Sequence, residues 1–173
     1  FLHICGSDFY FEGMAALASG RHEIVYAVRC DEDDPLTIRA AEALGVLVQI
    51  GRRPATLGEA HNGMMAAMPA AGVYVPWSDR MFVLTPGWDE EIAREAAAAP
   101  RRVMWWGSRQ DPHPTAPIIP AGWYAACGGK VFAGWFPFWF IDTWLAEVCE
   151  FVTGGDLTLL NTVEYGGRRG RTP

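Results

Sequence analysis

The sequence predicts an α/β protein with a three-layer, mostly parallel Rossmann-like sheet. Three observations support this fold class: short apolar runs recur along the first half of the chain, capped amphipathic stretches separate them, and the two kinds of segment alternate. Strands that alternate with helices in this way are joined by crossovers that build a parallel sheet. The chain has 173 residues, half of them hydrophobic, so we expect a single domain over 1–173.

Four strands are predicted before residue 80, because runs rich in β-branched and aromatic residues lie at 2–5, 23–29, 46–50 and 73–77. A helix over 8–18, closed by Ser19 and Gly20, would join the first two strands. Thr56 and Glu59 have the spacing of a capping box, which predicts another helix before the fourth strand.

The helix between the second and third strands carries clear start and stop signals. Asp34 is placed to cap it, Pro35 occupies its first position, and Gly45 ends it. From the helical period we expect four apolar side chains to point inward: Leu36, Ala40, Ala43 and Leu44.

After the fourth strand, Thr85 is expected to cap a helix that has Pro86 at its first position and ends near residue 99. The segment 110–120 holds so many prolines that we expect an irregular loop. The remaining predictions are a strand at 102–106, a helix at 142–152 and a last strand at 157–163.

Composition excludes two classes of partner. A net charge of -6 and the near absence of lysine argue against a nucleic-acid surface, and the basic tail of Arg168, Arg169 and Arg171 is typical of a frayed terminus. No apolar run reaches the roughly twenty residues of a transmembrane segment, and no signal peptide is present.

The cysteines indicate a reducing compartment. Cys5, Cys30, Cys127 and Cys149 are far apart and show no zinc-ligand spacing or disulfide framework, so we expect a cytoplasmic protein. The chain lacks an initiator methionine and begins almost inside a strand, which suggests a trimmed or incomplete N-terminus.

The stretch 73–89 is the predicted centre of function. An apolar strand ends there on Asp79, and in open α/β sheets ligands bind at the carboxyl ends of the strands. Asp31 follows the second strand in the same way. We therefore expect Asp31 and Asp79 to face the same cleft.

Four motifs in this order carry a family resemblance. They are Asp31-Glu-Asp-Asp34-Pro35, Leu57-Gly-Glu-Ala-His-Asn62, Ser78-Asp79 followed by Thr85-Pro-Gly-Trp-Asp89, and Phe140-Ile-Asp142-Thr-Trp144. The arrangement resembles the GT-A glycosyltransferases, particularly the large inverting family that includes many bacterial polysaccharide-building enzymes. The resemblance implies a nucleotide-diphospho-sugar donor, bound by about 1–100, and transfer of its sugar to an acceptor bound by about 101–173.

The resemblance also implies roles for individual residues. Asp31 and Asp33 would contact the base and ribose of the donor, and Asn62 would lie near the nucleotide. Asp79 would hold Mg²⁺ or Mn²⁺ on the diphosphate, where a divalent cation neutralises the charge that develops on the leaving group. The chain departs from the family pattern at Arg80, which stands where a second acid is expected. Arg80 could grip phosphate bidentately, or it could mean that catalysis has been lost.

Asp142 is the predicted catalytic base. It follows the apolar run 136–141, whose low dielectric could raise its pKa, and the same position in the resembling family carries that role. A purely structural role is also open, in which Asp142 merely caps a helix starting at Thr143.

The acids 31–34 could form only a solvated turn and a helix cap, and the whole chain could be an inactive nucleotide- or sugar-binding relative. An NAD-binding enzyme is disfavoured, because Cys5-Gly6-Ser7 stands where GxGxxG would follow the first strand. Six tryptophans could stack on sugars, although we expect half or more of them in the core: Trp105, Trp106, Trp123, Trp135, Trp139 and Trp144.

Overall fold

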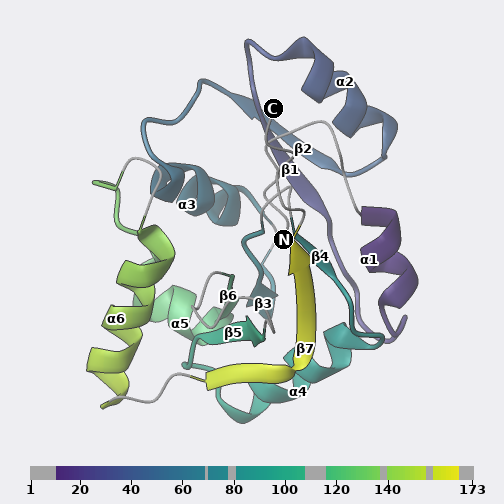
Figure 1. The fold of residues 1–173 in the computed structure, drawn as a ribbon. Helices are drawn as coiled ribbons and strands as arrows, with labels where there is room; N and C mark the ends of the chain where they lie inside the picture. Colours follow the sequence, from purple (N-terminus) through teal and green to yellow (C-terminus); the bar gives the residue numbers. More distant parts are fainter. Residues whose placement is uncertain are drawn as a thin grey trace.

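The computed structural model describes residues 11–68, 70–77, 81–107, 116–136, 140–154 and 158–167, whose arrangement is shown in Figure 1. The helices are α1 (Phe11–Leu17), α2 (Pro35–Ala43), α3 (Leu57–Ala67), α4 (Trp88–Ala98), α5 (Ala121–Ala126) and α6 (Ile141–Thr153). The strands are β1 (Ala27–Asp31), β2 (Leu47–Gly51), β3 (Val73–Tyr74), β4 (Met81–Val83), β5 (Met104–Gly107), β6 (Pro117–Pro120) and β7 (Thr158–Gly167). The predicted strand at 2–5 lies outside the described residues.

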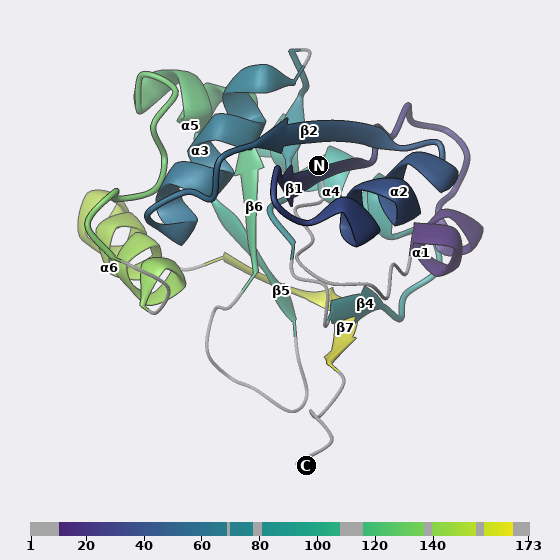
Figure 2. The same cartoon turned by 90° about the horizontal axis from the view of Figure 1, so that it is seen from above.

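Side chains of the strands alternate between two hydrophobic clusters. In β5, Met104 and Trp106 belong to one cluster and Trp105 belongs to the other. The first cluster includes residues of α1, α2 and α4, and the second includes residues of α3, α5 and α6. Because neighbouring strand residues point to opposite faces, helices cover both faces of the described strands. Figures 1 and 2 show α1 and α2 on one side and α3, α5 and α6 on the other.

Strand pairing corrects part of the predicted topology. β1 and β2 pair in parallel, and the larger sheet has the order β3-β6-β5-β7-β4. Within that sheet β5–β7 is parallel, whereas β3–β6, β5–β6 and β4–β7 are antiparallel. Among the strands described, the pairing is therefore mixed rather than mostly parallel. The connection 108–116 between β5 and β6 is shorter than the dozen or so residues that a parallel crossover needs.

The predicted starts of α2 and α3 are confirmed. Asp34 accepts hydrogen bonds from the Thr37 backbone N–H and hydroxyl, at 3.1 and 2.6 Å. Thr56 Oγ1 accepts from the Glu59 N–H at 3.1 Å, while Glu59 Oε2 accepts from the Ala55 N–H at 3.0 Å. Both caps are local interactions, in which a side-chain oxygen satisfies a backbone N–H of the first turn.

The predicted inner face of α2 is wrong. Leu36 is 71% exposed, and Ala43 and Leu44 are exposed as well. The helix instead presents Ala41 and the partly buried Ile38 to the first cluster. These two side chains lie about one turn apart, so α2 rests on the sheet through a narrow stripe.

The start of α4 also differs from the prediction. Gly87, not Thr85, is the N-cap residue, and the helix begins at Trp88 rather than at Pro86. Gly87 has a φ of 69°, a left-handed conformation that glycine adopts without a steric penalty. Its N–H donates to the Leu17 carbonyl at 2.7 Å, and the Trp88 indole N–H donates to the Met14 carbonyl at 3.1 Å. Contacts with α1 thus set where α4 begins.

The proline-rich segment corrects another prediction. Its last part forms β6, although we expected an irregular loop over 110–120, and residues 110–115 lie outside the described residues. Pro117 and Pro120 occupy the two ends of β6, whose four residues are all buried. Proline is tolerated at strand ends because its missing N–H costs no hydrogen bond in the middle of the ladder.

Most other predicted elements lie close to their predicted positions, but β3 covers only Val73–Tyr74 of the predicted strand 73–77, and β4 and α5 were not predicted. The predicted strand 23–29 is shifted, because β1 begins at Ala27, where pairing with Leu47 starts. α6 and β7 match the predictions for 142–152 and 157–163 to within a few residues. None of the helices described has both the length and the apolar character needed to cross a membrane.

The three described cysteines are free. Burial raises the pKa of the Cys149 thiol to about 12, with a smaller contribution from Cys127. It also raises the pKa of Cys30 and of Cys127. Cys149 is buried on the inner face of α6.

Candidate functional site

The carboxyl ends of β1 and β2 meet at one edge of the fold. Asp31 is the last residue of β1 and lies opposite Gly51, the last residue of β2. Arg53 lies two residues after the end of β2, and its Nε donates to Asp31 Oδ2 at 2.8 Å. Arg53 Nη2 lies 3.7 Å from Asp33 Oδ1, so a single guanidinium contacts two carboxylates. The hydrogen bond with Asp31 and the charge of Asp33 raise the pKa of Arg53.

A second arginine, Arg29, holds the loop after β2 to β1. Arg29 on β1 donates from Nη1 to Gln49 Oε1 at 3.3 Å and from Nη2 to the carbonyl oxygen of Arg52. A Cβ on Gly51 would lie only 3.3 Å from Arg29 Nη2. The side chain of Arg29 therefore ties β1 to the backbone of the loop that carries Arg53. The absence of a side chain at Gly51 leaves room for the Arg29 guanidinium.

The four acids 31–34 have different environments. Both oxygens of Asp34 are engaged by Thr37, and these hydrogen bonds lower the pKa of Asp34. Asp34 is thus the helix cap, whereas Asp31 and Asp33 contact Arg53. The Glu32 side chain is exposed. Within the described residues, no group of three or more His, Cys, Asp or Glu side chains is arranged to hold a metal ion.

α3 connects this edge with the start of α6. Its residue Gly58 packs so closely that a Cβ there would overlap the Ala133 carbonyl oxygen and lie 3.1 Å from Ile141 Cδ1. One turn further along, Asn62 Nδ2 donates to the Phe132 carbonyl at 2.8 Å and Asn62 Oδ1 accepts from the Phe132 N–H at 3.1 Å. The Asn62 side chain therefore holds the segment before α6 against α3.

Asp142 lies in the first turn of α6 and is partly buried. Its Oδ1 accepts from the Thr143 N–H at 2.8 Å. The helix begins at Ile141 and its N-cap residue is Phe140, so Asp142 is not the cap of a helix starting at Thr143. A carboxylate in this position is stabilised by the partial positive charge of the helix N-terminus.

Asp79 and Arg80 lie outside the described residues. The chain that leads to them is firmly packed, because Val75 and Trp77 are buried in the first cluster. The Trp77 ring meets that of Trp106 with 4.7 Å between the ring centroids and an interplanar angle of 67°.

Three of the five described members of the six-tryptophan set are in the core, in line with the expected half or more. Trp105, Trp106 and Trp123 are buried. Trp135 is 71% exposed and Trp144 is partly buried, while Trp139 lies outside the described residues. Of the described members of this set, only Trp135 and Trp144 remain as candidates for stacking against a ligand.

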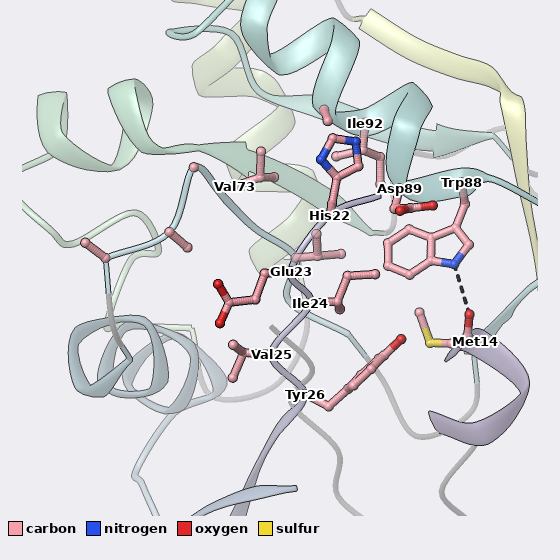
Figure 3. A pocket seen from close by; sticks show the side chains of 15 residues that line it. Met14, His22, Glu23, Ile24, Val25, Tyr26, Val73, Trp88, Asp89 and Ile92 are labelled. Carbon is pink, nitrogen blue, oxygen red and sulfur yellow. Dashed lines mark hydrogen bonds between the residues drawn. The ribbon is translucent and has the colours of Figure 1, made fainter. Parts of the chain in front are cut away.

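A cavity of about 430 Å³ lies at the opposite end of β1, between residues 22–26, residues 70–75 and α4 (Figure 3). Asp89 on its wall is buried, and Ser19 donates to it from the backbone N–H at 2.7 Å and from the hydroxyl at 2.6 Å. Burial alone would raise the pKa of Asp89, but the Ser19 hydrogen bonds and the nearby His22 outweigh burial and lower it. Burial and the charge of Asp89 raise the pKa of Tyr26.

Sequence patterns alone did not reveal two of these polar contacts. Arg53 could have been found from the arginine pair that follows the 46–50 strand after Gly51, at the edge where Asp31 was expected. The contact between Ser19 and Asp89 joins residues 70 positions apart, and no local pattern signals it.

No protein-family model matches the chain, and neither does any curated protein. Solved structures do match, among them two crystal structures of glucosyl-3-phosphoglycerate synthase from Mycobacterium tuberculosis. One is a complex with Mn²⁺, uridine diphosphate (UDP) and phosphoglyceric acid, and the other a complex with Mg²⁺ and UDP. Each has a TM-score of 0.68 and 13% identity and covers 97% of this chain, with 69% and 70% of the synthase chain covered. At this identity the likeness shows the fold, which is of the GT-A type that the motifs implied.

Proposed function

We propose that the protein binds a nucleotide-diphospho-sugar and transfers the hexosyl group to an acceptor hydroxyl by inverting displacement. The observation that carries this proposal is the bridge made by α3. This helix follows the Arg53 loop, and its Gly58 packs against Ala133 and Ile141 at the start of α6. The bridge supports one continuous site, with the donor at the Asp31 edge and the acceptor beside Asp142.

On the donor side we assign Asp31 and Asp33 to the base and ribose. Carboxylates accept hydrogen bonds from base N–H groups and ribose hydroxyls. Both carboxylates contact Arg53, so a nucleotide has to share them with that guanidinium or displace it. We place Asn62 near the nucleotide. Its two hydrogen bonds to the Phe132 backbone would position the segment that borders the nucleotide.

The described acids of this edge do not fit a divalent metal. Asp31 and Asp33 contact a guanidinium, and both carboxylate oxygens of Asp34 accept hydrogen bonds from Thr37. We therefore assign Mg²⁺ or Mn²⁺ to Asp79 alone. Arg80 beside it is assigned to the diphosphate, which a guanidinium can grip with two parallel hydrogen bonds.

On the acceptor side we assign Asp142 as the base. Its carboxylate would take the proton of the acceptor hydroxyl as that oxygen attacks the anomeric carbon. The bond from this carbon to the diphosphate oxygen breaks on the opposite face, and the diphosphate leaves with the bonding electron pair. A displacement of this geometry inverts the anomeric configuration. A positioned base contributes on the order of 10²- to 10⁴-fold to the rate.

The setting of the reaction follows from the same assignments. We propose that residues to about 100 bind the donor and residues from about 101 bind the acceptor. The free thiols of the described cysteines suit a reducing cytoplasm. Construction of a bacterial polysaccharide is the process that the resemblance suggests.

Thermal shift with UDP and GDP, each with and without Mn²⁺, tests donor binding. A ligand that binds only the folded protein raises the melting temperature by mass action. UDP is the first candidate, since the similar synthase was crystallised with it. Asp31→Asn should reduce the shift, whereas Glu32→Gln, an exposed neighbour in the same turn, should leave it unchanged. Absence of a shift with every nucleotide would overturn the proposal.

A second candidate function is nucleotide or sugar binding without catalysis. Two observations favour it: Arg80 replaces an expected acid, and Arg53 contacts both donor-side carboxylates. A nucleotide-dependent thermal shift without sugar transfer to any acceptor would select this function.

A further inference from the structure

An aromatic platform surrounds the start of α6. We define it by four side chains: Trp135, Phe136, Phe140 and Trp144. The ring centroids of Trp135 and Trp144 are 6.0 Å apart at an interplanar angle of 80°, an edge-to-face contact. Phe136 lies 6.2 Å from Trp135 and 6.5 Å from Trp144. The three rings therefore hold one another in place, and Trp135 remains 71% exposed.

The backbone at Phe140 supports a functional role for the platform. Phe140 has a φ of 67°, and it is the one non-glycine residue with positive φ in the described part of the chain. For a bulky residue this conformation costs roughly 1–2 kcal/mol, and such strain concentrates at ligand-binding sites. The conformation ends the loop at α6 and leaves the Phe140 side chain 69% exposed.

The charged residues of the segment that carries the platform are all acidic. The sequence from 131 to 154 contains Asp142, Glu147 and Glu150 but no lysine, arginine or histidine. The nearest basic residues in the sequence are Lys130 before this segment and Arg168 after it. An anionic ligand would find like charges on α6 and no cation of this segment to bind.

We propose that the aromatic platform is the acceptor subsite and that it takes a neutral sugar. This inference rests on the proposed transfer reaction and names its acceptor class. The apolar face of a pyranose ring stacks on an exposed indole, and Trp135 offers such a face. Asp142, in the first turn of the helix that also carries Trp144, offers a carboxylate that can accept a hydrogen bond from a sugar hydroxyl. The acceptor therefore differs in charge from the phosphoglyceric acid in the similar synthase complex.

Isothermal titration in saturating UDP tests the inference. The probes are the methyl glycosides of glucose, galactose and mannose, their neutral β-linked disaccharides, and 3-phosphoglycerate as the anionic comparison. We expect at least one neutral sugar to bind and 3-phosphoglycerate not to bind. Trp135→Ala should weaken sugar binding about tenfold, and Trp135→Phe by less than about threefold, because one aromatic face remains.

Phe151→Ala is the matched control. Phe151 is 89% exposed on the same helix, roughly 10 Å along the axis from Trp144, and has no described ring contact. It should leave both sugar binding and the UDP thermal shift unchanged. Trp135→Ala should likewise retain the UDP shift and the melting temperature, since its side chain is mostly exposed.

Each outcome separates the inference from the proposed function. A UDP shift without binding of any neutral sugar overturns the inference alone. Binding of 3-phosphoglycerate in place of sugars, or equal loss of sugar binding in Phe151→Ala, also overturns it. Sedimentation showing that wild type self-associates and Trp135→Ala does not would make the platform an interface between copies. Sugar binding without any nucleotide shift would support the subsite and overturn the transferase.

Discussion

The two ends of the proposed site differ in how their side chains are held. At the β1–β2 edge, Arg53 contacts Asp31 and Asp33 through ion pairs, whose carboxylates a ligand must share or take over. At the start of α6, aromatic rings contact one another and leave an indole face open. The first end suits a charged, hydrogen-bonding ligand and should respond to salt. The second suits an uncharged ring and should not.

The largest effect is expected from a variant that disrupts the packing of α3 against the start of α6, which connects these two ends. Gly58→Leu would force a side chain into the Ala133 carbonyl oxygen and Ile141, so we expect a loss of about 3 kcal/mol or more in the free energy of unfolding. Urea denaturation followed by circular dichroism measures it. Gly63→Ala, on the same helix with nothing within 4 Å of the added Cβ, should be neutral or stabilising. Similar stabilities for both variants would refute the close contact.

A second change acts on the acceptor end alone. Asp142→Asn keeps an oxygen that can accept from the Thr143 N–H, so the fold should remain intact. Transfer should fall on the order of a hundredfold, since an amide cannot take a proton. Single-turnover sugar transfer measures the rate, with Glu147→Gln, an exposed acid of the same helix, as control. An unchanged rate in Asp142→Asn would remove the residue from catalysis.

A third change removes the charge of Asp89, a buried aspartate on the wall of the cavity at the end of β1 that lies opposite Asp31. Asp89→Asn disturbs the two Ser19 hydrogen bonds and should cost about 1–2 kcal/mol in the free energy of unfolding at pH 7. Because folding lowers the pKa of Asp89, its contribution is complete above the unfolded pKa near 4 and is lost as the pH falls through the lower folded pKa. Urea midpoints from pH 7 to pH 2 should therefore converge for wild type and variant. A difference that stays constant across this range would contradict the assignment.

The smallest expected effect on stability concerns Arg53. Its side chain is 68% exposed, so Arg53→Ala should lower the melting temperature by no more than about 2 °C. The UDP thermal shift should nevertheless change, and lose part of its dependence on salt, because the guanidinium contacts the assigned donor residues. Arg52→Ala is the control, since the Arg52 side chain is exposed and has no described ion pair. Identical behaviour of the two variants would separate Arg53 from the donor site.

Local signals in the sequence predicted local structure well. The caps by Asp34 and Thr56 are confirmed because each depends on residues within one helical turn. The start of α4 was missed because the hydrogen bond from Gly87 to Leu17 sets it. β6 was missed because its prolines are accommodated between β3 and β5. In both cases contacts distant in sequence outweighed the local pattern.

For the site, too, the sequence predicted local features but not the contacts between distant segments. Strand ends and their acids could be located, so Asp31 was expected at the carboxyl edge, where β1 places it. The pairing of Arg53 with two acids and the contact of Gly58 with α6 depend on how separate segments meet. A sequence pattern contains no distances between such segments. The division of the tryptophans into core and surface likewise required the packed structure.

The environment of the thiols has a practical consequence for labelling. Cys30 and Cys149 are buried, and Cys30, Cys127 and Cys149 all have a raised pKa, so little of their thiolate forms at neutral pH. Alkylating dyes react with the thiolate, and these three native cysteines should react slowly. A cysteine introduced by Phe151→Cys, at an 89% exposed position, would then be the faster target. A fluorophore placed there would report on α6 while the three described thiols remain in place.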